Sequence, residues 1–291
     1  MGLDRGNQLA EVEAGVAEGA LVRASIWRLG IAWLLVWTMG CVGAAETAPL
    51  GRAVLRVAAA SDLTFVLPEI HRRFSATNPG IGVETVFGSS GGLVAQIRQG
   101  APFDLFLSAD RQHVDALVAS GMAVSNSITP YARGRLVVWS TRSAVSVGRG
   151  LEVLRDPDVR RLAIANPVHA PYGRAARETL QGAGLWTSWT NRLVLAENVA
   201  QAAQWVESGS VDLGLVSRSW VMAPRLAHVG QWWLVPAECH APLEQTAVVT
   251  RHGALRSGSQ RYLEHMREAA VVEILVRFGF DVAEREGVRD R

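Results

Sequence analysis

Cysteine is scarce in this chain. The 291 residues include only Cys41 and Cys239. Removal of a leader that contains Cys41 would leave one thiol, which cannot form an intramolecular disulfide. An exported protein of this kind relies on its hydrophobic core for stability. We interpret Cys239 as an incidental thiol in a loop, because prolines flank it at residues 236 and 242; a nucleophilic cysteine is the alternative.

The chain has neither a large excess of charge of one sign nor a cluster of catalytic residues. The formal net charge is only +2 at pH 7 and no long basic run occurs, so composition provides no case for nucleic-acid binding. The chain shows no internal repeat and no low-complexity tract. It also lacks paired carboxylates, a cluster of metal ligands and a Ser/His/Asp arrangement. We therefore expect neither an enzyme nor a cofactor or resident metal ion.

Apolar residues are abundant, and the first long apolar run has the features of an export signal. Hydrophobic residues make up 49% of the chain, which suffices for a large core or two lobes. Two arginines precede the apolar run 29–40, and small residues follow it at 42–45. This order is typical of a secretory signal peptide, and the run is too short to span a membrane comfortably. We interpret residues 1–45 as a signal peptide with an atypical polar leader; a retained membrane anchor or lipidation at Cys41 is the alternative.

From residue 53 onward, short apolar runs alternate with helical segments. The first unit is predicted to contain strands at 54–60, 83–87 and 103–108 and helices at 63–74, 92–99 and 111–120. The second is predicted to contain strands at 136–140, 161–165, 192–196 and 211–216 and helices at 173–181 and 199–207. A strand at 245–250 and an amphipathic helix at 260–278 are predicted to return to the first unit. Alternation of this kind predicts mainly parallel sheets with helices on both faces.

The pattern therefore predicts an α/β fold with two lobes, each a mainly parallel sheet flanked by helices. We expect the first lobe to comprise residues 46–130 and 240–291 and the second to comprise residues 131–239. The chain then crosses between the lobes twice, near 129–134 and 235–242. Paired crossings suit a hinge that closes over a ligand.

Two strand-to-helix turns, at residues 58–63 and 87–93, place a serine where a helix begins. A helix start presents backbone N–H groups without intrahelical partners and the positive end of the peptide dipoles. Two such starts aimed at one point, with Ser61 and Ser90 adding hydroxyl donors, would form a small oxyanion site without a cationic side chain. Ordinary N-capping by these serines is the alternative.

The order and spacing of several motifs resemble those of the periplasmic molybdate-binding proteins of ABC importers. The resemblance extends over residues 53–282. It implies a periplasmic location and the two-lobed periplasmic-binding-protein fold (type II), with the ligand cleft between the lobes. The matching motifs are Ala58–Ser61, Phe87–Ser90, Gly100–Asp110, Ala165–Gly173, Glu197–Val199 and Asp212–Val216.

The resemblance also implies which residues bind the ligand. In that family the oxyanion is held between the lobes by hydroxyls and backbone amides. Transferred to this sequence, Ser61 and Ser90 donate through hydroxyl and backbone, which favours ligand contact over ordinary capping. Tyr172 and Val199 donate through backbone N–H groups. The last position, where the family often has a tyrosine, is Ser217; either the Tyr172 hydroxyl replaces that phenol or Ser217 reaches the ligand through water.

A site built only from donors favours a fully deprotonated tetrahedral dianion, because monohydrogen phosphate would need an acceptor for its proton. The resemblance implies molybdate or tungstate as the ligand, and sulfate or another oxyanion is the alternative. Asp62 is the nearest carboxylate, and we expect it to face solvent in the first helical turn.

These observations predict a monomeric solute-binding protein without enzymatic activity. We expect it to capture molybdate or tungstate in the periplasm and to deliver the ion to the membrane permease of an ABC importer. Two alternatives belong to other classes. One is a sensory binding module of the same fold, and the other is an enzyme on this scaffold with Cys239 as the nucleophile.

Overall fold

A computed structural model of the chain describes residues 53–282. The predicted signal peptide at 1–45, and Cys41 within it, lie outside the described residues. Within the described range, no helix combines the length and the apolar character that crossing a membrane requires.

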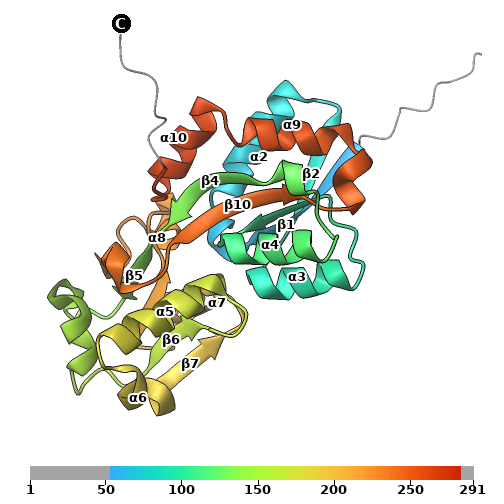
Figure 1. Cartoon of the computed structure of the whole chain (residues 1–291). Helices are drawn as coiled ribbons and strands as arrows, with labels where there is room; N and C mark the ends of the chain where they lie inside the picture. The colour runs from blue at the N-terminus through green and yellow to red at the C-terminus, as the bar shows by residue number, and fades with distance from the viewer. Residues whose placement is uncertain (1–52, 283–291) are drawn as a thin grey trace, which may run out of the picture. The chain divides into compact units, whose positions relative to one another are not determined.

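The first sheet has five strands in the order β2-β1-β3-β10-β4 (Figure 1). Parallel pairing joins β1 to β2 and to β3, whereas β10 runs antiparallel to both of its neighbours, β3 and β4. Four strands therefore share one direction and β10 alone is reversed. The strands are β1 Ala53–Ala60, β2 Ile81–Gly88, β3 Leu105–Ser108, β4 Thr129–Gly134 and β10 Leu243–Val249.

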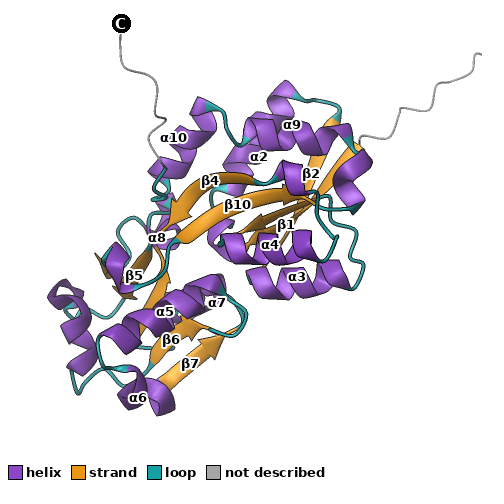
Figure 2. Ribbon diagram, viewed as in Figure 1, coloured by secondary structure: helices purple, strands orange, loops and turns teal. Residues whose placement is uncertain are grey.

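Helices cover both faces of this sheet (Figure 2). Successive side chains of a strand point to opposite faces, and β3 shows the result. Leu105 and Leu107 pack with α2, α9 and α10, whereas Phe106 packs with α3 and α4. Burial on both faces explains the unbroken apolar run at this strand. The helices are α2 Leu67–Thr77, α3 Ser90–Arg98, α4 Arg111–Ala119, α9 Ser257–His265 and α10 Ala269–Arg277.

The second sheet repeats the pattern of the first. Its order is β7-β6-β8-β5-β9, with β6 parallel to β7 and β8, and β5 antiparallel to β8 and β9. Trp139 and Trp189 are fully buried in its hydrophobic core. The strands are β5 Leu136–Ser140, β6 Leu162–Ala165, β7 Leu193–Ala196, β8 Leu213–Ser217 and β9 Gln231–Leu234. The helices are α5 Pro171–Gly182, α6 Trp186–Trp189, α7 Val199–Glu207 and α8 Arg218–Val221.

Short 3-10 helices connect several of these elements. They are η1 Ser61–Leu63, η2 Ser125–Ser127, η3 Val147–Arg155, η4 Thr190–Arg192, η5 Pro224–Leu226, η6 Ala237–Cys239 and η7 His252–Leu255. The predicted helix at 63–74 is thus two pieces, η1 and α2, and Pro68 lies in the first turn of α2, where its missing N–H removes no bond.

The observed bounds of one strand and of the last two helices correct two expectations. The segment 129–134 is strand β4 of the first sheet, so residues 131–134 do not belong to the second lobe. The chain crosses at Arg135, and it returns between β9 and β10. Pro130 and Gly134 made β4 look like a connection, yet Pro130 is accommodated where the register with β10 shifts. The predicted helix at 260–278 is also two helices, α9 and α10, separated by three residues.

Candidate functional site

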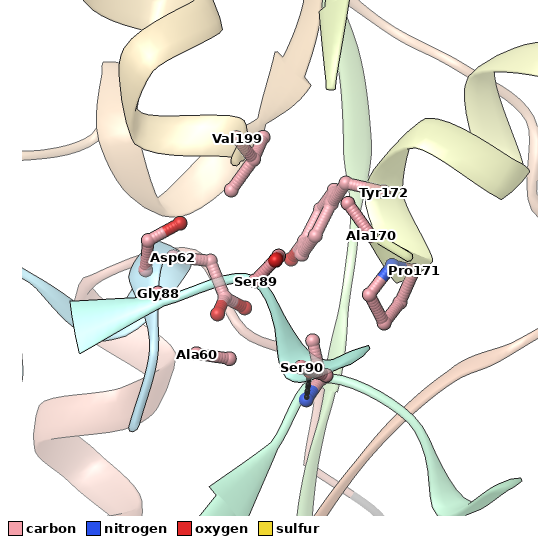
Figure 3. Close-up of a pocket in the computed structure, with 11 residues that line it drawn as sticks. Ala60, Asp62, Gly88, Ser89, Ser90, Ala170, Pro171, Tyr172 and Val199 are labelled. Carbon is pink, nitrogen blue, oxygen red and sulfur yellow. Dashed lines mark hydrogen bonds between the residues drawn. The ribbon is translucent and has the colours of Figure 1, made fainter. Parts of the chain in front are cut away.

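Four strand-to-helix turns and the end of β3 enclose a small pocket (Figure 3). Its cavity volume is about 10 Å³, close to that of one water-sized sphere, so the pocket suits only a ligand of very few atoms. Four of the five predicted site residues line it: Ser61, Ser90, Tyr172 and Val199. The other lining residues are Ala60, Asp62, Gly88, Ser89, Ala109, Ala170 and Pro171.

Helix starts from both sheets supply backbone donors to this pocket. Ser90, Pro171 and Val199 are the first residues of α3, α5 and α7. The first N–H groups of a helix have no intrahelical partner, and the dipole makes this end positive. Because Pro171 has no N–H, the first available donor of α5 belongs to Tyr172. The arrangement suits a small anion.

Neither of the predicted serines is an N-cap. The cap of α3 is Ser89, whose hydroxyl accepts from Gly92 N at 3.3 Å, and the residue before η1 is Ala60. Ser90 Oγ instead accepts from Ala109 N at 3.1 Å. Ser61 Oγ accepts from Ala200 N, which belongs to the second lobe, at 3.3 Å.

Both serines are nearly fully buried at the pocket. In the hydrogen bonds of the described residues, each of these two hydroxyls accepts a backbone N–H. A hydroxyl carries one donor in addition to its acceptor lone pairs. Each hydroxyl hydrogen is therefore available to a ligand in the pocket.

Direct contacts hold the two lobes together around the pocket. The His169 ring Nδ1 lies 2.9 Å from Ser89 Oγ, and the His169 carbonyl accepts from Gly91 N at 2.9 Å. A Cβ on Gly91 would lie 2.7 Å from that carbonyl oxygen, so this approach requires glycine. On the other side of the pocket, Arg174 Nη2 of α5 lies 2.9 Å from Asp110 Oδ2 at the start of α4.

The Tyr172 side chain is buried between the lobes. A Cβ on Gly134, at the end of β4, would collide with the Tyr172 hydroxyl oxygen. That oxygen lies near the Asp62 carboxyl, and burial together with this carboxyl raises the pKa of Tyr172 well above its usual range. The neutral phenol therefore keeps its proton beside Asp62 at the edge of the pocket.

Asp62 corrects an expectation, because it does not face solvent. Its exposed fraction is 3%, and it lines the pocket. Gln245 Nε2 donates to its Oδ2 at 2.8 Å, and the Tyr172 hydroxyl also interacts with the carboxyl group. Burial raises the pKa of Asp62 to about 7, against the opposing influence of Tyr172 and Gln245. An acidic residue in a first helical turn is ordinary in sequence, so the sequence contained no signal for this burial.

Ser217 is not brought to the pocket. It ends β8, is fully buried, and its Oγ lies 3.1 Å from Ser219 Oγ. Ser219 Oγ donates to the Asp62 carbonyl at 2.7 Å. Ser217 therefore supports the turn that holds Asp62, and its contact with a ligand through water stays a prediction.

Cys239 lies in η6, outside the pocket, and is partly buried. Burial and the neighbouring Glu238 raise the pKa of its thiol, which disfavours the thiolate that a nucleophile requires. Among residues 53–282, no group of three or more His, Cys, Asp and Glu side chains is placed to hold a metal ion.

Comparison with known proteins places the chain in a family. Residues 55–281 match the description "Bacterial extracellular solute-binding protein". The chain belongs to this family. Its relatives include the molybdate-binding protein ModA of Azotobacter vinelandii, 34% identical over 228 residues, which cover 78% of this chain and 90% of the relative. The ModA of Rhodobacter capsulatus is 35% identical over 239 residues, 82% of this chain and 92% of the relative.

A solved structure agrees with the sequence comparison. The periplasmic molybdate-binding protein of Azotobacter vinelandii superposes with a TM-score of 0.75 at 32% identity, over 79% of this chain and all of that one. Two predictions are therefore confirmed: the two-lobed α/β fold from the alternation of strands and helices, and the solute-binding-protein fold that the resemblance implies.

Proposed function

We propose that this chain is the periplasmic binding component of an ABC importer that captures molybdate or tungstate. The decisive observation is one small pocket at which helix starts of both lobes and two serine hydroxyls converge, with no cationic side chain in its lining. Relatives at 34% and 35% identity, named as molybdate-binding proteins, support the choice of ion. The membrane permease that receives the ion is the expected partner, and the binding protein acts as a monomer.

The donors act on the oxygen atoms of the ion. Ser61 and Ser90 donate through their hydroxyls, and Tyr172 and Val199 donate through backbone N–H groups at helix starts. None of these residues is a metal ligand, since molybdenum or tungsten stays enclosed by its own oxygens. Neutral donors in a buried site hold a dianion more strongly than they would in water. The protein performs binding and release and needs no cofactor.

The ion also favours the closed arrangement of the lobes. Ser61 and Ser90 belong to the first lobe, whereas Tyr172 and Val199 belong to the second. An ion that contacts both lobes binds the closed form better than an open one and shifts the population toward it. The contacts of His169 with Ser89 and Gly91 then form beside the bound ion.

Calorimetric titration of the purified chain with molybdate, tungstate, sulfate and phosphate tests the proposal. We expect one-to-one binding of molybdate and tungstate, with sulfate about a hundredfold weaker, which corresponds to about 2.7 kcal/mol. Ser61→Ala and Ser90→Ala should each weaken molybdate binding by about tenfold or more, because a hydrogen bond to a charged group contributes about 1.5–3 kcal/mol.

Ser120→Ala is the matched control, since this hydroxyl bonds only the Leu117 carbonyl of α4 at 2.9 Å and lies outside the pocket. It should bind like the unmodified chain. A preference for sulfate would keep the transport role and change the substrate. Absence of binding to all four ions would refute the proposed function.

A further inference from the structure

The pocket contains an ionisable group that a site for a dianion does not require. Asp62 lines it together with the four predicted ligand residues. We propose that Asp62 takes up a proton when the oxyanion binds, so that capture of the dianion consumes one proton and weakens as the pH rises. This inference rests on the proposed function and concerns the same site.

Two neutral side chains, Gln245 and Tyr172, interact with the Asp62 carboxyl group, and only Gln245 does so with normal hydrogen-bond geometry. Tyr131 Oη donates to Gln245 Oε1 at 3.2 Å, which turns the Gln245 amide N–H₂ toward Asp62. Gln245 Nε2 then donates to Asp62 Oδ2 at 2.8 Å. Oδ1 is buried and makes no hydrogen bond of normal geometry, and the nearby Tyr172 hydroxyl only partly offsets the effect of burial. A proton on Oδ1 would turn this unsatisfied acceptor into a donor, in keeping with the other groups that line the pocket.

The surroundings of Asp62 provide no positive charge to stabilise its ionised form. The titratable groups that interact with it are Tyr172 of α5 and Tyr131 of β4, and burial keeps both phenols neutral by raising the pKa of each well above its usual range. The charged side chains of the elements packed against η1 pair with other residues. These pairs are Glu84 of β2 with Arg56, Glu207 of α7 with Arg225, and Arg218 of α8 with Asp281.

Two further charged residues lie on the strands that carry Tyr131 and Gln245. Arg133 of β4 and Glu244 of β10 oppose each other in the strand register. Both line a separate surface pocket together with Val282. They therefore do not compensate a charge on Asp62.

The negative charge of a bound oxyanion would make the ionised form of the Asp62 carboxyl still less favourable. A like charge nearby, in addition to burial, stabilises the neutral form of an acid. Figure 3 shows the side chains of Asp62 and Tyr172 entering the same small pocket, so a dianion held there would lie beside the carboxyl. The balance is one carboxylate, one proton from solvent and one dianion, which give one neutral carboxylic acid beside the bound dianion. No covalent bond other than the O–H bond changes.

The pH dependence follows from this balance. Below about pH 7 the ligand-free Asp62 already holds its proton, so affinity should not depend on its titration. Above about pH 7, binding must recruit the proton, and the dissociation constant should rise by about tenfold for each pH unit. The measurement is calorimetry with molybdate, which stays a dianion, at several values between about pH 6 and about pH 9.

Proton uptake can be measured directly in the same experiment. At about pH 8, titration in two buffers of different ionisation enthalpy should report uptake of about one proton per bound ion. In Asp62→Asn the uptake and the slope should disappear, because the amide mimics the protonated acid: its oxygen accepts from Gln245 and its N–H₂ replaces the acid proton. Asp104→Asn is the control, since Asp104 is equally buried but is paired with Arg256 at 2.9 Å and lies outside the pocket. It should keep the slope and the uptake.

Two results would overturn the inference while leaving the proposed function intact. One is molybdate binding by the unmodified chain without proton uptake at about pH 8. The other is full uptake retained in Asp62→Asn. Failure of the unmodified chain to bind any oxyanion, at acidic as well as alkaline pH, would instead refute the proposed function and this inference with it.

Discussion

Replacing Asp62 by asparagine should stabilise the ion-free protein at neutral and alkaline pH. The unfolded chain loses the Asp62 proton near the ordinary pKa of 3.8, whereas the folded protein with its lobes closed keeps it up to about 7. Between these values the folded state binds more protons than the unfolded state, so the free energy of unfolding falls as the pH rises. Because one pKa unit corresponds to about 1.4 kcal/mol, a rise from 3.8 to about 7 makes this loss about 4 kcal/mol by pH 7.

Asparagine has the shape of the protonated acid but does not titrate. The gain in unfolding free energy from Asp62→Asn should therefore be near zero at about pH 4 and should approach about 4 kcal/mol at about pH 7.5. Urea unfolding at both pH values, without any oxyanion in the buffer, measures the difference. An equal effect of the substitution at the two pH values would contradict the reasoning.

Asp110 provides a contrast of opposite sign. Burial favours its neutral form, but the hydrogen bond and charge of His113 and the charge of Arg174 outweigh burial, so the pKa of Asp110 is lowered. Its contribution to stability is present above the unfolded pKa and is lost as the pH falls through the folded one. Asp110→Asn should therefore destabilise the protein at neutral pH, in the same assay that shows Asp62→Asn to be stabilising.

Two further predictions concern the contacts between the lobes. Arg174→Gln removes a partly buried ion pair with Asp110, so the closed form should lose about 1 kcal/mol. Molybdate binding should weaken by about threefold to tenfold through faster dissociation. Stopped-flow displacement measures the dissociation rate, and an unchanged rate would exclude a role of this ion pair in closure. Gly91→Ala introduces a Cβ 2.7 Å from the His169 carbonyl oxygen and should weaken binding by about tenfold or more. Without the ion, the Gly91→Ala variant and the unmodified chain should show the same thermal unfolding by circular dichroism. A variant that does not fold would contradict the view that the substitution affects only lobe closure.

Much of the fold could be predicted because the central strands of both sheets are buried on both faces. Such strands appear as unbroken apolar runs, as in 105–107 and 213–216. The exceptions have local causes. Strand β4 contains Pro130 and ends at Gly134, which are typical of a connection, and the α9–α10 boundary falls in a segment where apolar residues continue at helical spacing.

The site was predictable only to the extent that it follows from helix starts. Ser61 and Ser90 lie at the carboxyl ends of strands, where ligands of α/β sheets bind. The roles of Tyr172 and Val199 were predicted only through the family resemblance. The burial of Asp62 was not predictable, because α7 and α8 of the other lobe pack against its turn. Ser217 was placed by resemblance, and its burial beneath Ser219 likewise depends on that packing.

The reversed strand β10 has a consequence for the order in which the chain acquires its structure. In the first sheet β10 lies between β3 and β4, which are joined to each other only through it. A chain that emerges from its amino-terminal end therefore exposes two unpaired strand edges until residues beyond Leu243 have followed. Pairing over such a sequence separation is slow to form. We infer that the sheet of the first lobe cannot be completed during synthesis until residues 243–249 are available.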